Sequence, residues 1–398
     1  MGSLFAELAR RASANARREV ETYVRQIPEL GSLDVNSRAR AETLEYAVWF
    51  RHRTVELAPD NGRLTDDDLA YIASMGEARA GAGMSLDSRQ RVLRVHTGLM
   101  LREIDEATEA QRGGDVEEIM RIMGWFAPQG ERGIGAYRQG FVAAMGRRLP
   151  YVDQVGLLAR SLLAEDPIAA ELAPVTGLEL AEYYAVTVVR VPDCPAGDHV
   201  LESGIESLVR THQVPVTWWP ERGGRGGELI VLVPGGAGGA EPSAVPDLLP
   251  DLTRALGRLC AVGTTGAAAL SELAGALDRA RRIAAAAPLR RTSGRLRPHT
   301  LADVFVELTV ADVPFVDDWL RTVALCLAPG PDLLRTLDAY YRHDLNRGST
   351  ALALNVHPRT LDYRLRRVRE LAGIDPGSAR GVRILSAVVT RSLSGAWR

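Results

Sequence analysis

The 398-residue sequence contains no lysine, so all 48 of its basic side chains are arginines, and 50 acidic residues nearly balance them. The odd number and wide spacing of its three cysteines, Cys194, Cys260 and Cys326, argue against a disulfide framework and favour buried free thiols. No apolar run approaches the roughly 18 residues of a membrane-spanning helix, and the N-terminus has no apolar signal-peptide core. We therefore expect a cytoplasmic protein, whose length suits two to four domains.

Short motifs typical of enzymes are also absent. The sequence has no G-x-S-x-G, H-E-x-x-H or C-x-x-C, and its seven histidines are scattered. The glycine-rich segment Pro234–Ala240 follows an apolar run but lacks the Gly-Lys-Ser/Thr of a phosphate-binding loop. These patterns predict no catalytic residue, no metal site and no cofactor.

Residues 1–150 carry apolar side chains at steps of three and four, which is typical of amphipathic helices. Turn signals separate the segments, for example at Pro128, Gln129 and Gly130. The simplest architecture is a helical bundle that senses a signal or binds a partner. The expected helices are Leu4–Tyr23, Ser37–Leu57, Thr65–Ala82, Ser85–Glu109, Asp115–Ala127 and Glu131–Arg147.

A mixed pattern follows a linking helix over residues 151–163. Strands and helices are expected in the order strand, helix, strand, strand, helix, strand, which is the ferredoxin-like βαββαβ pattern. We assign it to a domain of residues 165–287, whose last segment, 270–287, reads as a connecting helix. The expected strands are Tyr184–Val191, Val214–Trp219, Glu228–Val233 and Leu259–Gly263, and the expected helices are Leu201–His212 and Ala244–Arg258.

The C-terminal part is predicted to be helical. Residues 299–330 are expected to form a connector, and residues 331–398 a helix-turn-helix domain. Its first short helix is expected to begin after Gly348, with Ser349 or Thr350 as the cap. A turn over residues 355–357 precedes Pro358, which suits the first position of a second helix. The whole chain is thus multidomain and mainly α, with one α+β domain.

The second helix of this motif has an apolar side and a polar side. Leu361, Leu365, Val368 and Leu371 recur at helical spacing and form a stripe that must pack on a neighbour. Residues 355–398 carry nine arginines and three acidic residues, a net charge of +6 on a chain whose net charge is −2. Such a basic end is expected of a nucleic-acid-binding domain. In a helical-wheel projection, Thr360 and Arg364 lie nearer the apolar stripe. The polar side groups Arg359, Tyr363, Arg366 and Arg367.

The segment Val356–Val368 resembles the C-terminal DNA-binding domain of PucR/CdaR-type bacterial transcriptional regulators. The upstream segment Pro331–Asn346 resembles the support helix of that family. Pro358 and Arg359 depart from the family pattern, and Arg359 stands where asparagine is usual, which puts the identity of one recognised base in question. The positions that coincide with the family pattern are His357, Thr360, Leu361, Tyr363, Arg364, Leu365 and Arg367.

Two further resemblances cover the rest of the chain. Residues 71–100 are similar to the RsbRD-type N-terminal domain found on many PucR-like regulators. The middle domain resembles the degenerate GGDEF-like domain of CdaR-type regulators, and Gly226–Pro234 is similar to the hairpin of active cyclases. That hairpin keeps Glu228 but lacks the other carboxylates that hold divalent metals in a cyclase. The resemblance therefore implies a domain without catalysis.

The resulting hypothesis is a transcriptional regulator that binds double-stranded DNA as a homodimer or higher oligomer, with a possible small-molecule effector. A stress-signalling adaptor and, less plausibly, a nucleotide-processing enzyme are the alternatives. The predicted DNA-contacting residues are Ser349, Thr350, His357, Arg359, Thr360, Tyr363, Arg364, Arg366 and Arg367.

Overall fold

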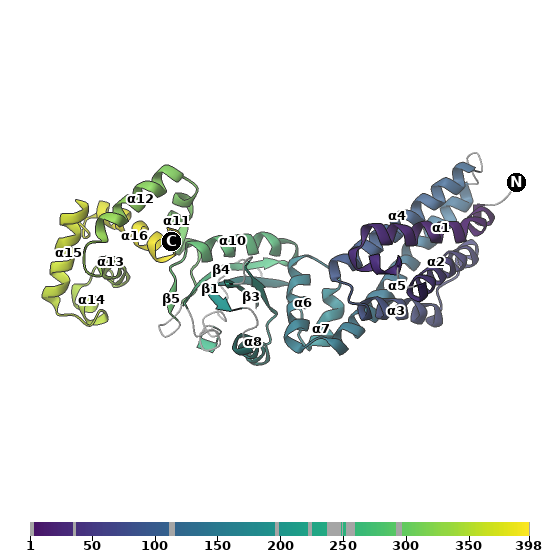
Figure 1. Ribbon diagram of the computed structural model, residues 1–398, viewed down its shortest axis with the longest axis horizontal. Coiled ribbons are helices and arrows are strands. Elements are labelled where there is room, and N and C mark those ends of the chain that lie inside the picture. Colours follow the sequence, from purple (N-terminus) through teal and green to yellow (C-terminus); the bar gives the residue numbers. More distant parts are fainter. Residues whose placement is uncertain are drawn as a thin grey trace. The chain divides into compact units, whose positions relative to one another are not determined.

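The computed structural model describes residues 4–34, 37–110, 116–195, 199–221, 225–236, 259–291 and 297–397, together with the single positions 248, 250 and 251. The chain divides into two compact units, residues 1–150 and residues 151–398 (Figure 1). Each unit has its own buried apolar core.

The first unit is helical throughout its described part, as predicted. Thr65 begins one of its helices with a capping box, in which the Thr65 side chain and Asp68 satisfy each other's backbone N–H groups. Leu4, Ile72, Ile122 and Trp125 are among the side chains that form the core. The helices are α1 (Leu4–Gln26), α2 (Ser37–Leu57), α3 (Asp66–Gly81), α4 (Leu86–Ala110) and α5 (Val116–Arg148), with short 3-10 helices η1 (Pro28–Asp34) and η2 (Ala58–Asp60).

Helix α5 corrects the prediction of a turn at residues 128–130. It runs unbroken for 33 residues with Pro128 inside it, although an interior proline costs a helix about 3 kcal/mol. Tertiary contacts on both sides of the proline offset that cost. Trp125 is buried and donates from Nε1 to the carbonyl of Gly62, and the Gln129 side chain accepts from the backbone N–H of Leu64. Further along, α3 lies so close that a Cβ atom at Gly140 would overlap the carbonyl of Ala73.

A buried charged network crosses the core of this bundle. Arg51 lies between Glu19 and Glu103, with nitrogen–oxygen distances of 2.7 and 2.6 Å, and all three side chains are 3% exposed. His96 Nδ1 lies 2.9 Å from Glu19, and the Tyr23 hydroxyl donates to the same carboxylate. Burial alone raises the pKa of Glu19, but His96, Arg51 and Tyr23 together bring it well below its usual range. His96 therefore has a structural partner within the bundle.

The second unit begins with α6 (Tyr151–Leu163) and α7 (Ala169–Thr176) and continues into an antiparallel sheet. The strand order is β2-β3-β1-β4-β5, so β1 is central, and Val188 pairs with Ile230 on β3 and with Gly263 on β4. The four predicted strands are all present, and β5 is an addition. The elements are β1 (Tyr183–Pro195), α8 (His199–His212), β2 (Val216–Pro220), β3 (Arg225–Gly235), β4 (Leu259–Ala269), η3 (Leu270–Glu272), α10 (Leu273–Ala286) and β5 (Arg290–Arg291).

Helix α10 corresponds to the connecting helix expected at the end of the 165–287 segment, and it packs on the sheet. Figure 1 shows it lying along the sheet, and its buried side chains include Leu273, Leu277 and Ile283. The backbones approach closely, because a Cβ atom at Gly263 would overlap the backbone of Ala284. Most of the expected helix Ala244–Arg258 lies outside the described residues.

The cysteines only partly follow the expectation of buried thiols. Cys260 on β4 is buried, and burial raises the pKa of its thiol to about 12. Cys326, in contrast, is exposed near the end of a helix. Nothing is described for the side chain of Cys194.

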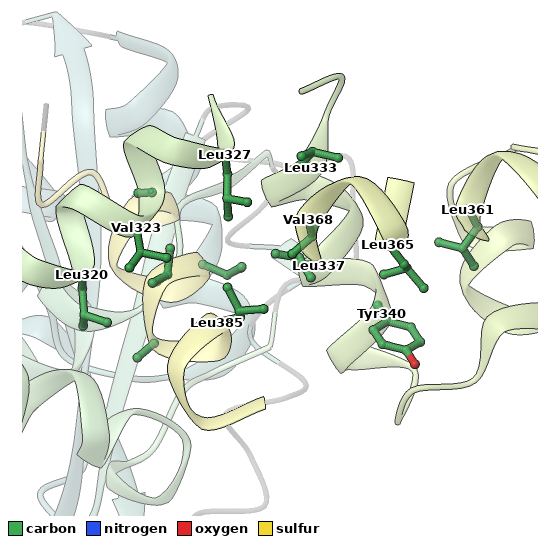
Figure 2. Packing of buried hydrophobic residues seen from close by; sticks show 14 of the residues in the cluster. Leu320, Val323, Leu327, Leu333, Leu337, Tyr340, Leu361, Leu365, Val368 and Leu385 are labelled. Atoms are coloured by element: carbon green, nitrogen blue, oxygen red, sulfur yellow. The ribbon is translucent and has the colours of Figure 1, made fainter. Parts of the chain in front are cut away.

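The helices that complete the second unit share a core. Leu320 and Leu327 of the predicted connector are buried with Leu337 and Leu385 of the predicted helix-turn-helix domain (Figure 2). An ion pair reinforces this packing, since Arg391 makes two hydrogen bonds to the Asp317 carboxylate. The helices are α11 (Leu301–Ala311), α12 (Pro314–Leu327), α13 (Leu333–Arg342), α14 (Arg347–Ala353), α15 (Pro358–Ala372) and α16 (Ala379–Leu393).

Candidate nucleic-acid interface

The turn between α14 and α15 has the local chemistry of a helix-turn-helix. Asn355, at φ 53°, takes the left-handed conformation that asparagine tolerates, and the chain then extends to His357. His357 caps α15 because its Nδ1 accepts from the backbone N–H of Arg359 at 3.2 Å, and Pro358 occupies the first turn. Gly373, at φ 67°, ends α15. The predicted start of this helix at Pro358 is confirmed.

Helix α14 begins slightly earlier than predicted, and its cap is Asn346. The Asn346 side chain accepts from the backbone N–H of Ser349 at 3.0 Å, so neither Ser349 nor Thr350 is the capping residue. Asparagine is as good a cap as serine, so Asn346 was an equally suitable cap residue in the sequence. Ser349 itself is exposed.

The apolar stripe of α15 fixes the orientation of the helix. Leu361 and Val368 are 0% exposed and Leu365 is 6% exposed, all within the core that α12, α13 and α16 share. Figure 2 shows these three side chains with Leu337 and Tyr340 of α13 in that cluster. The opposite side of α15 is thereby left facing solvent.

Five of the predicted contact residues form one exposed surface, which we call the α15 face. Tyr363 is 49% exposed, and the guanidinium of Arg366 lies over its ring at 5.9 Å from the centroid. Among the described residues, no hydrogen bond or ion pair holds the side chains of Arg359 and Thr360, in the first turn of the helix, against the fold. The members of the α15 face are His357, Arg359, Thr360, Tyr363 and Arg366.

Two predicted contact residues lie elsewhere. Thr350 is 0% exposed, and its hydroxyl donates to the carbonyl of Asn346 at 2.6 Å, so it stabilises the start of α14. The Arg364 side chain is 15% exposed and donates to Thr336 Oγ1 on α13 at 3.2 Å, with Asp332 Oδ2 3.6 Å away. Both side chains are therefore committed to contacts inside the domain, which leaves them less available to DNA than the α15 face.

Charged neighbours surround the α15 face. Arg367, another predicted contact, is half-buried and pairs with Glu370 at 3.0 Å. Arg347 at the start of α14 lies 3.5 Å from Asp362 on α15 and is 66% exposed. Arg347 was not predicted, because the cap of this helix was expected at Ser349 or Thr350 and not at Asn346. Both arginines lie on or beside the same motif and can contribute positive charge to it.

Glu228, the carboxylate of the β2–β3 hairpin, is engaged by an arginine. Glu228 accepts from Arg281 Nε on α10 at 2.8 Å, and the Arg281 guanidinium lies over the ring of Trp219 at 4.4 Å. Among the residues that the structure describes, no group of three or more His, Cys, Asp or Glu side chains is arranged to hold a metal ion. Within the same residues, no helix is long and apolar enough to cross a membrane.

Comparison with known families accounts for both ends of the chain. Residues 333–389 match the family model of the PucR C-terminal helix-turn-helix domain. Residues 13–152 match the N-terminal domain of the RsbT co-antagonist protein rsbRD. The chain therefore carries these two domains, and the predicted resemblance to PucR/CdaR-type regulators is confirmed.

Two individual proteins show similarity to the chain. The carbohydrate diacid regulator of Escherichia coli (strain K12) is 48% identical over 46 residues, which is 12% of this chain and 12% of that protein. The chain thus matches only a small part of that relative. A crystal structure of a regulator of polyketide synthase expression from Bifidobacterium adolescentis has 18% sequence identity and a TM-score of 0.28, covering 63% of this chain and 98% of that one.

Proposed function

We propose that this protein is a transcriptional regulator that binds double-stranded DNA by inserting α15 into the major groove. The observation that carries the proposal is the α15 face. It exposes two arginines, a tyrosine, a threonine and a histidine on a helix whose other side is locked into a core. The match of residues 333–389 to a PucR helix-turn-helix domain supports the same function.

The chemistry of the α15 face suits base recognition near the start of the helix. Arginine can pair with guanine O6 and N7, while threonine and tyrosine suit phosphate oxygens or a thymine methyl group. Residues in the first turns of a recognition helix reach the base edges. We therefore assign base contact to Arg359, a contact with bases or phosphate to Thr360 and Tyr363, and phosphate contact to Arg366. Arg364 is a positioning residue in this scheme.

A homodimer follows from the size of this surface. One recognition helix reads only a few base pairs, so two copies about 34 Å apart on the duplex are expected for specific binding. The two domains before residue 299 are proposed to set this spacing, and an effector would shift the population between arrangements that fit DNA and those that do not. The cytoplasm is the location that this function requires.

The middle domain is proposed to be a GGDEF-like remnant of ferredoxin-like topology. The sheet order β2-β3-β1-β4 and the alternation of strands and helices support this topology. The engagement of Glu228 by Arg281 supports a role without metal chemistry. The proposed domains of the chain are residues 1–150, 165–287, 299–330 and 331–398. The helical connector of residues 299–330 packs on the helix-turn-helix domain of residues 331–398.

An adaptor function is the second candidate, and the N-terminal match supports it. The family that matches residues 13–152 is described as the N-terminal domain of an RsbT co-antagonist protein, a description that points to signalling and not to DNA. If the purified protein retained no DNA fragment but captured a protein of that signalling class, the adaptor would replace the regulator as the main function.

The test is a genome-wide selection of bound fragments with the purified full-length protein at a stated salt concentration. A shared inverted motif is expected. Arg359→Ala should then weaken binding to that motif by about 1–3 kcal/mol, whereas Arg210→Ala on α8 should not. The helical content of both variants should match that of the parent by circular dichroism. No enrichment of any motif, or equal affinity of parent and Arg359→Ala, would contradict the proposal.

A further inference from the structure

A cleft of about 980 Å³ lies in the second unit, away from the α15 face. Strand β4, helix α10 and helix α11 provide its walls. The volume is at the upper end of the range of small-molecule sites, which are typically concave and mostly apolar. Neither the family matches nor the proposed contacts with DNA give this cleft a role.

The apolar part of the lining is large for a surface that faces solvent. Leu301 and Phe305, on the same side of α11, are each 58% exposed. Ile283 of α10 and Leu308 of α11 form the interior of the cleft, where Ile283 packs with Ala286 and Val304. An exposed phenylalanine and leucine beside a cavity indicate a surface that binds an apolar group.

The polar part of the lining is positively charged. Arg279 and Arg282 are three residues apart on α10, so they lie on the same side of that helix, and both line the cleft. Asp312 is the one acidic residue of the lining and lies 2.7 Å from Arg282, while Arg279 forms no ion pair within the described part of the chain. The cleft therefore has one arginine more than it has carboxylates.

We propose that this cleft binds a small amphipathic anion, with an aromatic or aliphatic body against Phe305 and Leu301 and a carboxylate on Arg279 and Arg282. A carboxylate matches the guanidinium geometry and would share Arg282 with Asp312. The hydroxyls of Thr300 and Thr309, which also line the cleft, already donate to Asp303 and to the carbonyl of Phe305, so the positive charge for a carboxylate comes from the two arginines.

Helix α11 links this cleft to the DNA-binding core. Leu308 packs against Ile283 and Ala286 of α10, whereas Val310 packs against the core that contains Leu361 and Leu365. Glu307 is buried beside Thr390 and Arg391 of α16. A ligand that moves α11 would therefore act on the packing that holds α15. This consequence rests on the proposed DNA-binding function, whereas the ligand site does not.

Ligand binding is tested first, without DNA. Isothermal titration calorimetry of the full-length protein with 3-phenylpropionate and decanoate should give saturable binding, and the uncharged 3-phenylpropanol and decanol should bind more weakly. Arg279→Gln should weaken the binding of the two carboxylates by about 10- to 100-fold and leave the binding of the two alcohols unchanged. The matched control is Arg335→Gln, which replaces an exposed arginine on α13. This substitution should change neither the affinity for the carboxylates nor the affinity for the alcohols.

A second variant distinguishes binding in this cleft from binding elsewhere on the chain. Ala302→Trp places a large ring in the cleft from an exposed helix position and should abolish binding of all four probes while the melting temperature is kept. The inference is overturned if no carboxylate binds saturably, or if both variants bind like the parent. The inference is also overturned if Ala302→Trp leaves probe binding as in the parent and changes only the sedimentation coefficient of the protein. That result would mean that a second copy of the chain occupies the cleft.

The link to DNA is tested last. By reciprocity, a carboxylate that binds the cleft should change the affinity for the selected DNA motif in the parent but not in Ala302→Trp. Ligand binding without any change in DNA affinity would overturn the link through α11 and leave the site intact. Absence of DNA binding altogether would count against the proposed function and not against the cleft.

Discussion

Replacing Arg364 with methionine would remove a guanidinium that is held inside the DNA-binding domain and keep much of its apolar stem. The guanidinium donates to Thr336 Oγ1, and the Thr336 side chain is buried. A hydrogen bond from a charged donor to such a group is worth about 1.5–3 kcal/mol, whereas the pair with Asp332, whose side chain is 62% exposed, contributes little. We expect the free energy of unfolding of the C-terminal helices to fall by about 1–3 kcal/mol.

The assay for this prediction has two readings. Urea unfolding followed by circular dichroism reports stability, and fluorescence anisotropy at a temperature where the variant is folded reports DNA affinity. Arg359→Met is the matched control, because Arg359 is exposed on the same helix. It should keep the stability and lose affinity, whereas Arg364→Met should lose stability and keep most of the affinity. If Arg364→Met lost affinity as strongly as Arg359→Met at unchanged stability, the assignment of Arg364 as a positioning residue would be wrong.

Three other changes test the core and the charged network. Leu361→Ala should lower the free energy of unfolding by about 2–5 kcal/mol in urea titrations, since the side chain is 0% exposed. The first unit should lose stability as the pH falls below about 4.5, because the pKa of Glu19 is lower in the folded than in the unfolded protein. Glu19→Gln should weaken this pH dependence of stability in acid titrations. A fragment of residues 331–398 should be largely unfolded by circular dichroism and one of residues 299–398 folded, since only the longer one keeps Leu320 and Leu327. Equal helicity per residue in the two fragments would argue against a shared core.

The orientation of α15 could be predicted because it depends on local information. A stripe of apolar residues at helical spacing determines which side of the helix is buried, whatever the partner is, and Leu361, Leu365 and Val368 are all buried. The polar side follows from the same periodicity, which is why Arg359, Tyr363 and Arg366 are exposed as expected.

The sequence is least informative about residues whose environment is set by distant parts of the chain. Arg364 is polar and lies beside the stripe, but its role depends on Thr336, which is 28 residues earlier. Pro128 is a helix breaker by propensity, yet contacts from residues 62–64 stabilise the helix around it. Helical spacing also shows that α10 has a buried side, but it does not show that the sheet is what covers it. Such long-range contacts leave no periodic signal in the sequence.

The DNA-binding helices are joined to the sheet by specific bonds as well as by chain connectivity. Arg290 of β5 makes two hydrogen bonds of 2.6 Å to Asp338 on α13, which is the helix that packs against α15. On the other side, Arg190 of β1 donates to the carbonyl of Ser394, just after α16, at 2.8 Å. A shift of β1 or β5 would therefore displace α13 or α16 before it reached α15. Because the stripe of α15 packs in the same core, a signal from the sheet domain can alter the presentation of Arg359 without any contact with it.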